Sequence, residues 1–131
     1  MVSESGNFPS SAEAPDGDWP GLDVAGGLDQ VFNKQALYRK LLGSYCASNE
    51  ATAQKLDAAL AAGDRNQLNR LAHTLKGTSG TLGMPAVYAA ALALERADPA
   101  ASPAQLAALL DQLKLAQEIV RVSIERYLAS D

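Results

Sequence analysis

The sequence predicts an all-α protein, built as an antiparallel up-and-down four-helix bundle with a short additional N-terminal helix. Hydrophobic residues make up 47% of the chain but aromatic residues only 5%. Alanine and leucine, the strongest helix formers, are abundant, whereas β-branched residues are scarce. Apolar residues recur at spacings of three and four, and short connections between long helices force antiparallel neighbours. A chain of 131 residues has the size of one domain.

Residues 1–20 are expected to form a flexible linker, and residues 21–131 the helical domain. The linker is rich in Ser, Pro, Gly and acidic residues and has no hydrophobic period. Such a tether suggests that the domain was excised from a larger protein. Trp19, at the end of the linker, is expected to pack on the edge of the bundle.

Three helical segments are expected in the first half of the domain. The first spans about 24–32, the second about 34–47, and the third begins after Asn49, its N-cap, and runs to about residue 62. Gly63 ends it, because glycine readily adopts φ > 0. The single Cys46 excludes an internal disulfide and is expected to be a small buried hydrophobe. The inward-facing residues are Leu37, Leu41 and Tyr45, with Tyr38 and Leu42 beside them, and Ala53, Leu56 and Leu60.

The second half of the domain is expected to form three further helices. Asp64 caps the first, which runs to about Leu82 and stops at Gly83. Pro85 starts the second, and Ser102 with Pro103 opens a long final helix. The inner faces consist of Leu68, Leu71, Ala72, Leu75, Ser79 and Leu82, then Val87, Ala91 and Leu94, then Leu106, Leu109, Leu113, Ala116, Val120, Ser123 and Tyr127. The apolar residues of the last helix, at spacings of three and four, would also fit a coiled coil between chains. A bundle within one chain uses the same packing, and the other helices supply the partners for it.

The only histidine, His73, is predicted to point away from the core. It lies roughly 160° from the centre of the apolar stripe of its helix, at about 100° per residue. Two of its exposed neighbours are glycines, each costing about 1 kcal/mol against alanine inside a helix. A physical reason for glycine here is the close approach of another protein's backbone or of a phosphoryl group. The neighbours on this face are Asn66, Asn69, Arg70, Lys76, Gly77 and Gly80.

The run from His73 to Gly77, followed by small residues and then by Leu82 and Gly83, resembles the signature of histidine-containing phosphotransfer (HPt) domains. The resemblance covers about residues 20–128, and includes flanking segments at 21–24, 27–28, 60–64 and 92–95. It implies a four-helix bundle with a short extra helix and a phosphorylatable histidine in mid-helix. It also implies that Nε2 takes a phosphoryl group from a receiver-domain aspartyl phosphate and passes it to a response-regulator aspartate. The expected context is a bacterial two-component phosphorelay, with the domain derived from a hybrid sensor histidine kinase.

The resemblance also suggests roles for the neighbours of His73. Lys76, one turn further on, would offset phosphoryl charge, although alone it would be taken for an ordinary solvated lysine. Glu95 stands where the family often has a polar residue near the other ring nitrogen, and would orient the imidazole; alternatively it pairs with Arg96 at the surface. The expected partner-binding patch consists of Asn66, Asn69, Arg70, Lys76, Gly77 and Gly80, with an apolar rim from the short first helix.

Several classes of function are not expected. A net charge of −4 without a basic stripe argues against nucleic-acid binding. No phosphate-binding loop or acidic cluster occurs, so the chain is expected to be a phosphocarrier without autonomous kinase activity, and the partner receiver supplies Mg²⁺. No metal site or cofactor is expected, because one histidine and one cysteine on different helices do not make a ligand set. No segment has the roughly 20 apolar residues that a membrane span needs, and the N-terminus lacks the features of a signal peptide, so a cytoplasmic location is expected, with a membrane tether where the domain belongs to a sensor kinase. A monomer is expected, because nothing in the predicted outer faces demands a dimer.

Two other classes of protein are consistent with a helical bundle. One is a non-catalytic adaptor that binds receiver domains without carrying phosphate, and the other is a helical scaffold without a partner. An exposed His73 beside Lys76 and Gly77 argues against both, because neither needs that combination.

Overall fold

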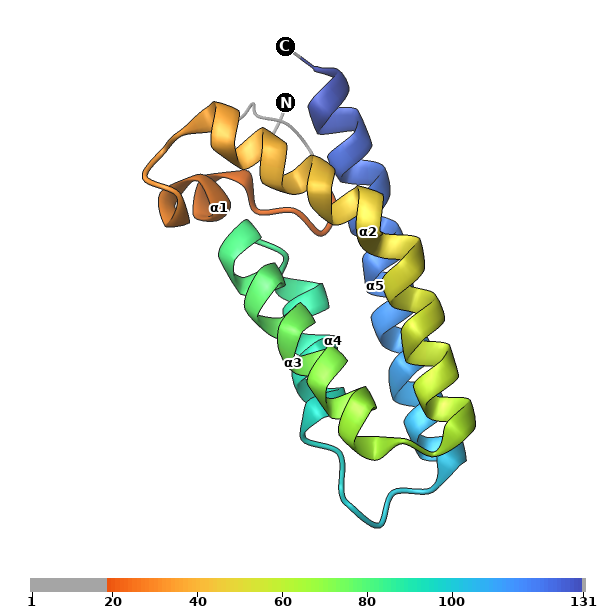
Figure 1. The fold of residues 1–131 in the computed structure, drawn as a ribbon. Helices are drawn as coiled ribbons and strands as arrows, with labels where there is room; N and C mark the ends of the chain where they lie inside the picture. Colours follow the sequence, from red (N-terminus) through yellow and green to blue (C-terminus); the bar gives the residue numbers. More distant parts are fainter. Residues whose placement is uncertain (1–18, 131) are drawn as a thin grey trace, which may run out of the picture.

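The computed structural model describes residues 19–130, which fold into five α-helices without a β-strand (Figure 1). The predicted all-α helical bundle is confirmed. The linker predicted for residues 1–20 lies outside the described residues, apart from Trp19 and Pro20. The helices are α1 (Val24–Gln30), α2 (Gln35–Ala62), α3 (Arg65–Leu82), α4 (Pro85–Glu95) and α5 (Pro103–Ala129).

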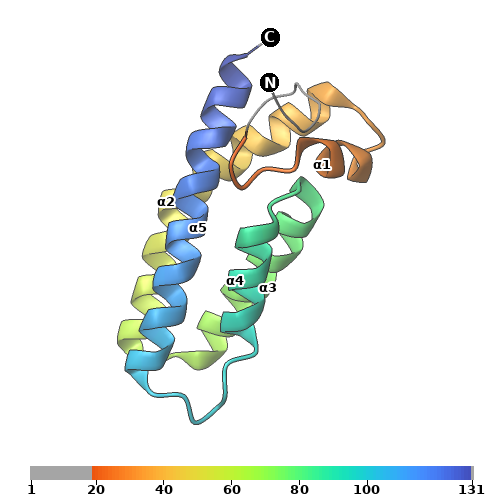
Figure 2. The same cartoon turned by 180° about the vertical axis from the view of Figure 1, so that it is seen from behind.

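The four longer helices surround one core in the order α2, α3, α4, α5, and α5 closes the bundle against α2. The views from the front and from behind show α2 alongside α5 and α3 alongside α4 (Figures 1 and 2). In the diagonal pairs, α2 with α4 and α3 with α5, no two Cα atoms lie within 8 Å of each other. The short α1 packs against α3 and α2. Each long helix therefore has one side that faces the solvent, and the solvent-facing sides of α3 and α5 lie on opposite sides of the bundle.

Local signals in the sequence mark most helix ends. Gly63 and Gly83, with φ of 68° and 79°, follow α2 and α3 in the left-handed conformation. The side chain of Asp64 accepts a hydrogen bond from the backbone N–H of Gln67 (3.0 Å) and caps α3. Before α5, Ser102 and Gln105 form a reciprocal capping box. These ends agree with the predicted ones.

The predicted break at Asn49 is wrong, because α2 is one continuous helix of 28 residues. Asn49 does not cap a helix; its Oδ1 accepts a hydrogen bond from Nε2 of Gln117 (3.0 Å). An asparagine that competes with helical backbone in isolation is tolerated when its side chain has a tertiary partner. Similarly, α1 ends at Gln30 and not near residue 32, since Phe32 and Asn33 adopt φ of 58° and 60°.

The core differs from the predicted one on α5 and α2, and on α3 at Leu71, which is only partly buried. On α5, Leu110, Gln117 and Ile124 are buried, whereas the predicted Leu109, Ala116 and Tyr127 are only partly buried. The reason is that α5 packs against both α2 and α4. Its buried face therefore extends further towards α2 than the single line of apolar residues predicted from the sequence. On α2, Leu37 is exposed, Leu41, Ala53 and Leu60 are partly buried, and Tyr38, Leu42, Tyr45 and Leu56 are buried as predicted.

Two further sequence expectations concern Trp19 and Cys46. Trp19 packs edge-on against Tyr127, with 5.3 Å between ring centroids, which confirms its predicted place at the edge of the bundle. Cys46 is only partly buried, and burial raises the pKa of its thiol. Within residues 19–130, no helix combines the length and the hydropathy that a membrane span requires.

Candidate functional site

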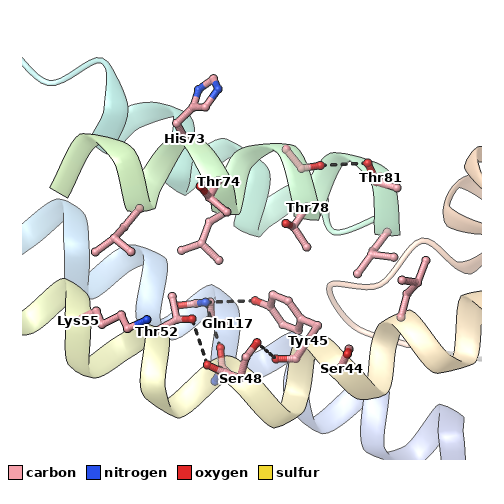
Figure 3. A pocket seen from close by; sticks show the side chains of 16 residues that line it. Ser44, Tyr45, Ser48, Thr52, Lys55, His73, Thr74, Thr78, Thr81 and Gln117 are labelled. Atoms are coloured by element: carbon pink, nitrogen blue, oxygen red, sulfur yellow. Dashed lines mark hydrogen bonds between the residues drawn. The ribbon is translucent and has the colours of Figure 1, made fainter. Parts of the chain in front are cut away.

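Helix α3 carries His73 on its outward face, as the spacing of its apolar residues predicts. Leu68, Ala72 and Leu75 are buried on the inner face, together with Ser79 and Leu82, and Leu71 is partly buried. The side chain of His73 is 67% exposed. Figure 3 shows its imidazole projecting from α3 away from α2. The ring is therefore open to a partner molecule.

Glu95, the last residue of α4, holds one nitrogen of this ring. Nδ1 of His73 lies 2.6 Å from Oε2 of Glu95. An ionised carboxylate only accepts hydrogen bonds, so Nδ1 carries the hydrogen and the lone pair of the neutral ring resides on Nε2. The structure thus places Glu95 against His73 and does not leave it to pair with Arg96.

Lys76 contacts the same carboxylate from the next turn of α3. Its Nζ lies 2.8 Å from Oε1 of Glu95, and the two side chains are 24% and 23% exposed. The hydrogen bond from Lys76, followed by that from His73, holds the pKa of the Glu95 carboxyl below its usual value. Each carboxylate oxygen therefore has its own cationic or N–H partner. The sequence analysis did not predict the Lys76–Glu95 pair, because no local pattern relates residues on separate helices.

Arg65, the first residue of α3, ties the end of α4 to the start of α3. Its guanidinium donates hydrogen bonds to the backbone carbonyls of Ala97, Asp98 and Pro99, at 3.5, 3.3 and 3.2 Å. These carbonyls belong to residues two to four positions after Glu95 in the chain. The clamp therefore limits the movement of Glu95 relative to His73.

The two glycines of the exposed face have different surroundings. A Cβ added at Gly77 would meet nothing within 4 Å, so packing within the described residues gives no reason for glycine. A Cβ at Gly80 would lie 3.4 Å from Cδ2 of Tyr88, which is an ordinary contact. Gly80 therefore contributes to packing against α4, whereas Gly77 lies in open space beside His73.

The polar residues predicted for a partner-binding patch lie on this same outward face. Asn66, Asn69 and Arg70 are all exposed. Arg70 donates a hydrogen bond to Oε1 of Gln67 (2.9 Å), its neighbour on α3. The structure thus brings the predicted patch together around His73 on a single helix.

A hydroxyl-lined groove of about 920 Å³ runs between α2 and α3, next to Gly77. His73 borders it, but the imidazole points away from the α2 side (Figure 3). At its floor, Nε2 of Gln117 donates hydrogen bonds to the hydroxyl oxygen of Tyr45 and to Asn49 (3.2 and 3.0 Å). The sequence analysis missed this groove, although the spacing of its hydroxyl residues at three and four is a usable signal. These residues are Ser44, Ser48 and Thr52 on α2, and Thr74, Thr78 and Thr81 on α3.

Comparison with known proteins connects this site to a family. Residues 40–119, more than half of the chain, match the sequence profile described as the Hpt domain. The chain belongs to the Hpt domain family. Histidine phosphotransfer in phosphorelays is the general function of this Hpt domain, and receiver domains are the class of partner that it implies.

The Hpt domain is also similar to a solved structure, that of histidine-containing phosphotransfer protein B (HptB) from Pseudomonas aeruginosa PAO1. The two share 26% sequence identity and a TM-score of 0.71, over 85% of this chain and 96% of the other. A search of curated proteins found no similar sequence. Among residues 19–130, no group of three or more His, Cys, Asp or Glu side chains is arranged to hold a metal ion.

Proposed function

We propose that His73 is the phosphoacceptor of this Hpt domain. It takes a phosphoryl group from the aspartyl phosphate of one receiver domain and passes it to the aspartate of a response regulator. The observation that carries this proposal is the contact between Nδ1 of His73 and Glu95 (2.6 Å). With Nδ1 engaged and the side chain 67% exposed, Nε2 is the nitrogen free to attack.

The transfer requires one bond to form and one to break. The lone pair of Nε2 attacks phosphorus, the bond between phosphorus and the aspartate oxygen breaks, and the receiver's carboxylate leaves. The phosphorylated ring keeps its hydrogen on Nδ1 and gains positive charge, which the Glu95 carboxylate stabilises through their hydrogen bond. The second transfer reverses these steps onto another aspartate. Positioning and charge stabilisation therefore account for the contribution of this chain.

Lys76 has two roles in this proposal. Through its contact with Oε1, it keeps Glu95 ionised and therefore able to accept from Nδ1. Its ammonium also lies one helical turn from His73, close enough to offset the negative charge of a phosphoryl group. In the free protein, Nζ of Lys76 contacts Oε1 of Glu95. Phosphorylation of His73 is expected to draw Nζ away from this oxygen and towards the phosphoryl oxygens.

The receiver is proposed to approach over Gly77, where the absence of a side chain leaves the α3 backbone open. Asn66, Asn69 and Arg70 surround His73 with exposed polar groups, and Gly80 continues the flat face beyond it. The short α1 would supply the apolar rim. In this proposal the chain binds no cofactor of its own, and the receiver contributes the Mg²⁺ that its aspartyl phosphate chemistry needs.

The test is phosphoryl transfer from a panel of phosphorylated receiver domains to the wild type and to His73→Gln. The wild type should acquire an acid-labile label, and His73→Gln should acquire none while remaining folded. Lys40→Gln, an exposed change on α2 outside the proposed receiver-binding patch, serves as the control that keeps the phosphoacceptor. Equal labelling of His73→Gln would refute the assignment. Receivers that bind the wild type but never label it would instead support a non-catalytic adaptor.

A further inference from the structure

The outer face of α5 carries a continuous apolar ridge. Leu115, Ile119 and Val122 are 63%, 44% and 44% exposed. Single exposed hydrophobic residues are common, but neighbouring ones form an apolar patch, which indicates an interaction surface. Their spacing of four and three places them on one side of the helix. We refer to these three residues as the α5 ridge.

The surface beside the α5 ridge is also apolar. An open groove of about 430 Å³ separates α5 from α4, and no charged side chain lines it. Its α4 wall consists only of alanines, namely Ala86, Ala89, Ala90 and Ala93. Small side chains beside a ridge of large ones leave room for the large side chains of another helix, as in knobs-into-holes packing.

Opposite charges lie at the two ends of the ridge. Asp111 precedes Leu115 by one turn and Arg126 follows Val122 by one turn, and both are exposed. Arg126 also lies over the ring of Trp19, with 5.6 Å from Cζ to the ring centroid. Two copies of α5 packed antiparallel would place Leu115 against the second copy's Val122, and Asp111 against its Arg126. Parallel packing would instead place Asp111 against the second copy's Asp111 and Arg126 against its Arg126.

We propose that a second copy of this chain covers the α5 ridge, forming a dimer with antiparallel α5 helices about a two-fold axis near residues 118 and 119. The ends of the ridge are complementary in charge under this symmetry, as a two-fold interface requires. Glu118 comes close to its own copy at the axis, and its ion pair with Arg121 on the same helix offsets its charge. Helix α5 lies diagonally across the bundle from α3. Both copies of His73 therefore stay open to partners. A monomer was expected from the sequence, but the exposed residues of the α5 ridge favour a dimer.

The first test is sedimentation equilibrium of the full chain over a concentration series reaching about 1 mM, the range of weak association. A dimer is expected, and Leu115→Glu should weaken it at least about tenfold. Leu37→Glu, on α2 and 41% exposed, is the matched control and should leave the association unchanged. Circular dichroism confirms that both variants remain helical.

The second test concerns the orientation. Asp111→Arg should weaken the dimer, and adding Arg126→Asp should restore it. In a Cys46→Ser background, Ile119→Cys should form a disulfide between copies, because it lies near the axis. Ala108→Cys should not, since antiparallel packing separates its two copies by about 30 Å along the helices. A chain that stays monomeric throughout, a dimer indifferent to Leu115→Glu, or a cross-link through Ala108→Cys would each overturn the proposal.

Discussion

Nδ1 of His73 and Oε2 of Glu95 lie 2.6 Å apart, although 22 residues separate them in the chain. The contact joins the middle of α3 to the last residue of α4. It converts an exposed histidine, which could present either nitrogen, into one with Nε2 facing the solvent. The nucleophilic role of Nε2 in phosphoryl transfer depends on this contact.

Replacing Glu95 is expected to slow phosphoryl transfer without abolishing it. Glu95→Gln keeps an acceptor for Nδ1 but loses the negative charge, and Glu95→Ala loses both. Because hydrogen bonds to charged groups are about twice as strong as neutral ones, the rate should fall at least about tenfold in Glu95→Ala and less in Glu95→Gln. Single-turnover transfer from one phosphorylated receiver measures this. Equal rates in all three proteins would show that Glu95 has no orienting role.

The Glu95 carboxyl should also make stability depend on pH in the acid range. Its pKa in the folded protein is below the ordinary value of 4.5, so its ionised form stabilises the fold. This contribution is complete above 4.5 and is lost as the pH falls through the folded pKa. Urea denaturation of the wild type and of Glu95→Gln should therefore give a difference in unfolding free energy that is constant at neutral pH and shrinks in acid. A difference independent of pH would contradict the His73–Lys76–Glu95 contacts.

Gly77→Ala is expected to stabilise the protein while impairing its function. A Cβ at Gly77 meets nothing within 4 Å, so alanine should raise the free energy of unfolding by about 1 kcal/mol through its helix propensity. The added side chain should obstruct the docking receiver and slow the transfer. Gly43→Ala is the matched control, since a Cβ there has only Cδ1 of Leu128 within reach, at 4.0 Å. It should stabilise similarly and leave transfer unchanged, and a Gly77→Ala variant that transfers normally would exclude close approach at this position.

Two helix-ending glycines should differ in their tolerance of alanine. Both have positive φ, but a Cβ at Gly63 meets nothing, whereas one at Gly83 would overlap the carbonyl oxygen of Asp23. Gly63→Ala should therefore cost about 1 kcal/mol from its left-handed backbone alone. Gly83→Ala should cost at least about 2 kcal/mol, because the segment before α1 must move as well. Denaturant unfolding compares them, and equal losses would show that α1 does not pack closely against the end of α3.

Most helix ends and the exposure of His73 could be predicted, because the signals are local. Asp64, Gly63, Gly83 and the capping box at Ser102 act within one turn of the residue that carries them. The position of His73 opposite the apolar stripe follows from the period of the helix alone. The prediction that Asn49 caps a helix was wrong because it considered only local sequence. The side chain of Asn49 accepts its hydrogen bond from Gln117, which lies on α5.

The sequence by itself determined that this chain forms a helical bundle with one histidine facing the solvent, followed on the same helix face by Gly77 and Gly80. Only the tertiary structure decided that Lys76 and His73 share the carboxylate of Glu95, that α2 continues through Asn49, and that α5 keeps an apolar ridge outside the core. The physical reason is that helix periodicity fixes which side chains share a face. It does not fix the height and rotation at which one helix meets the next, and those decide which side chains touch.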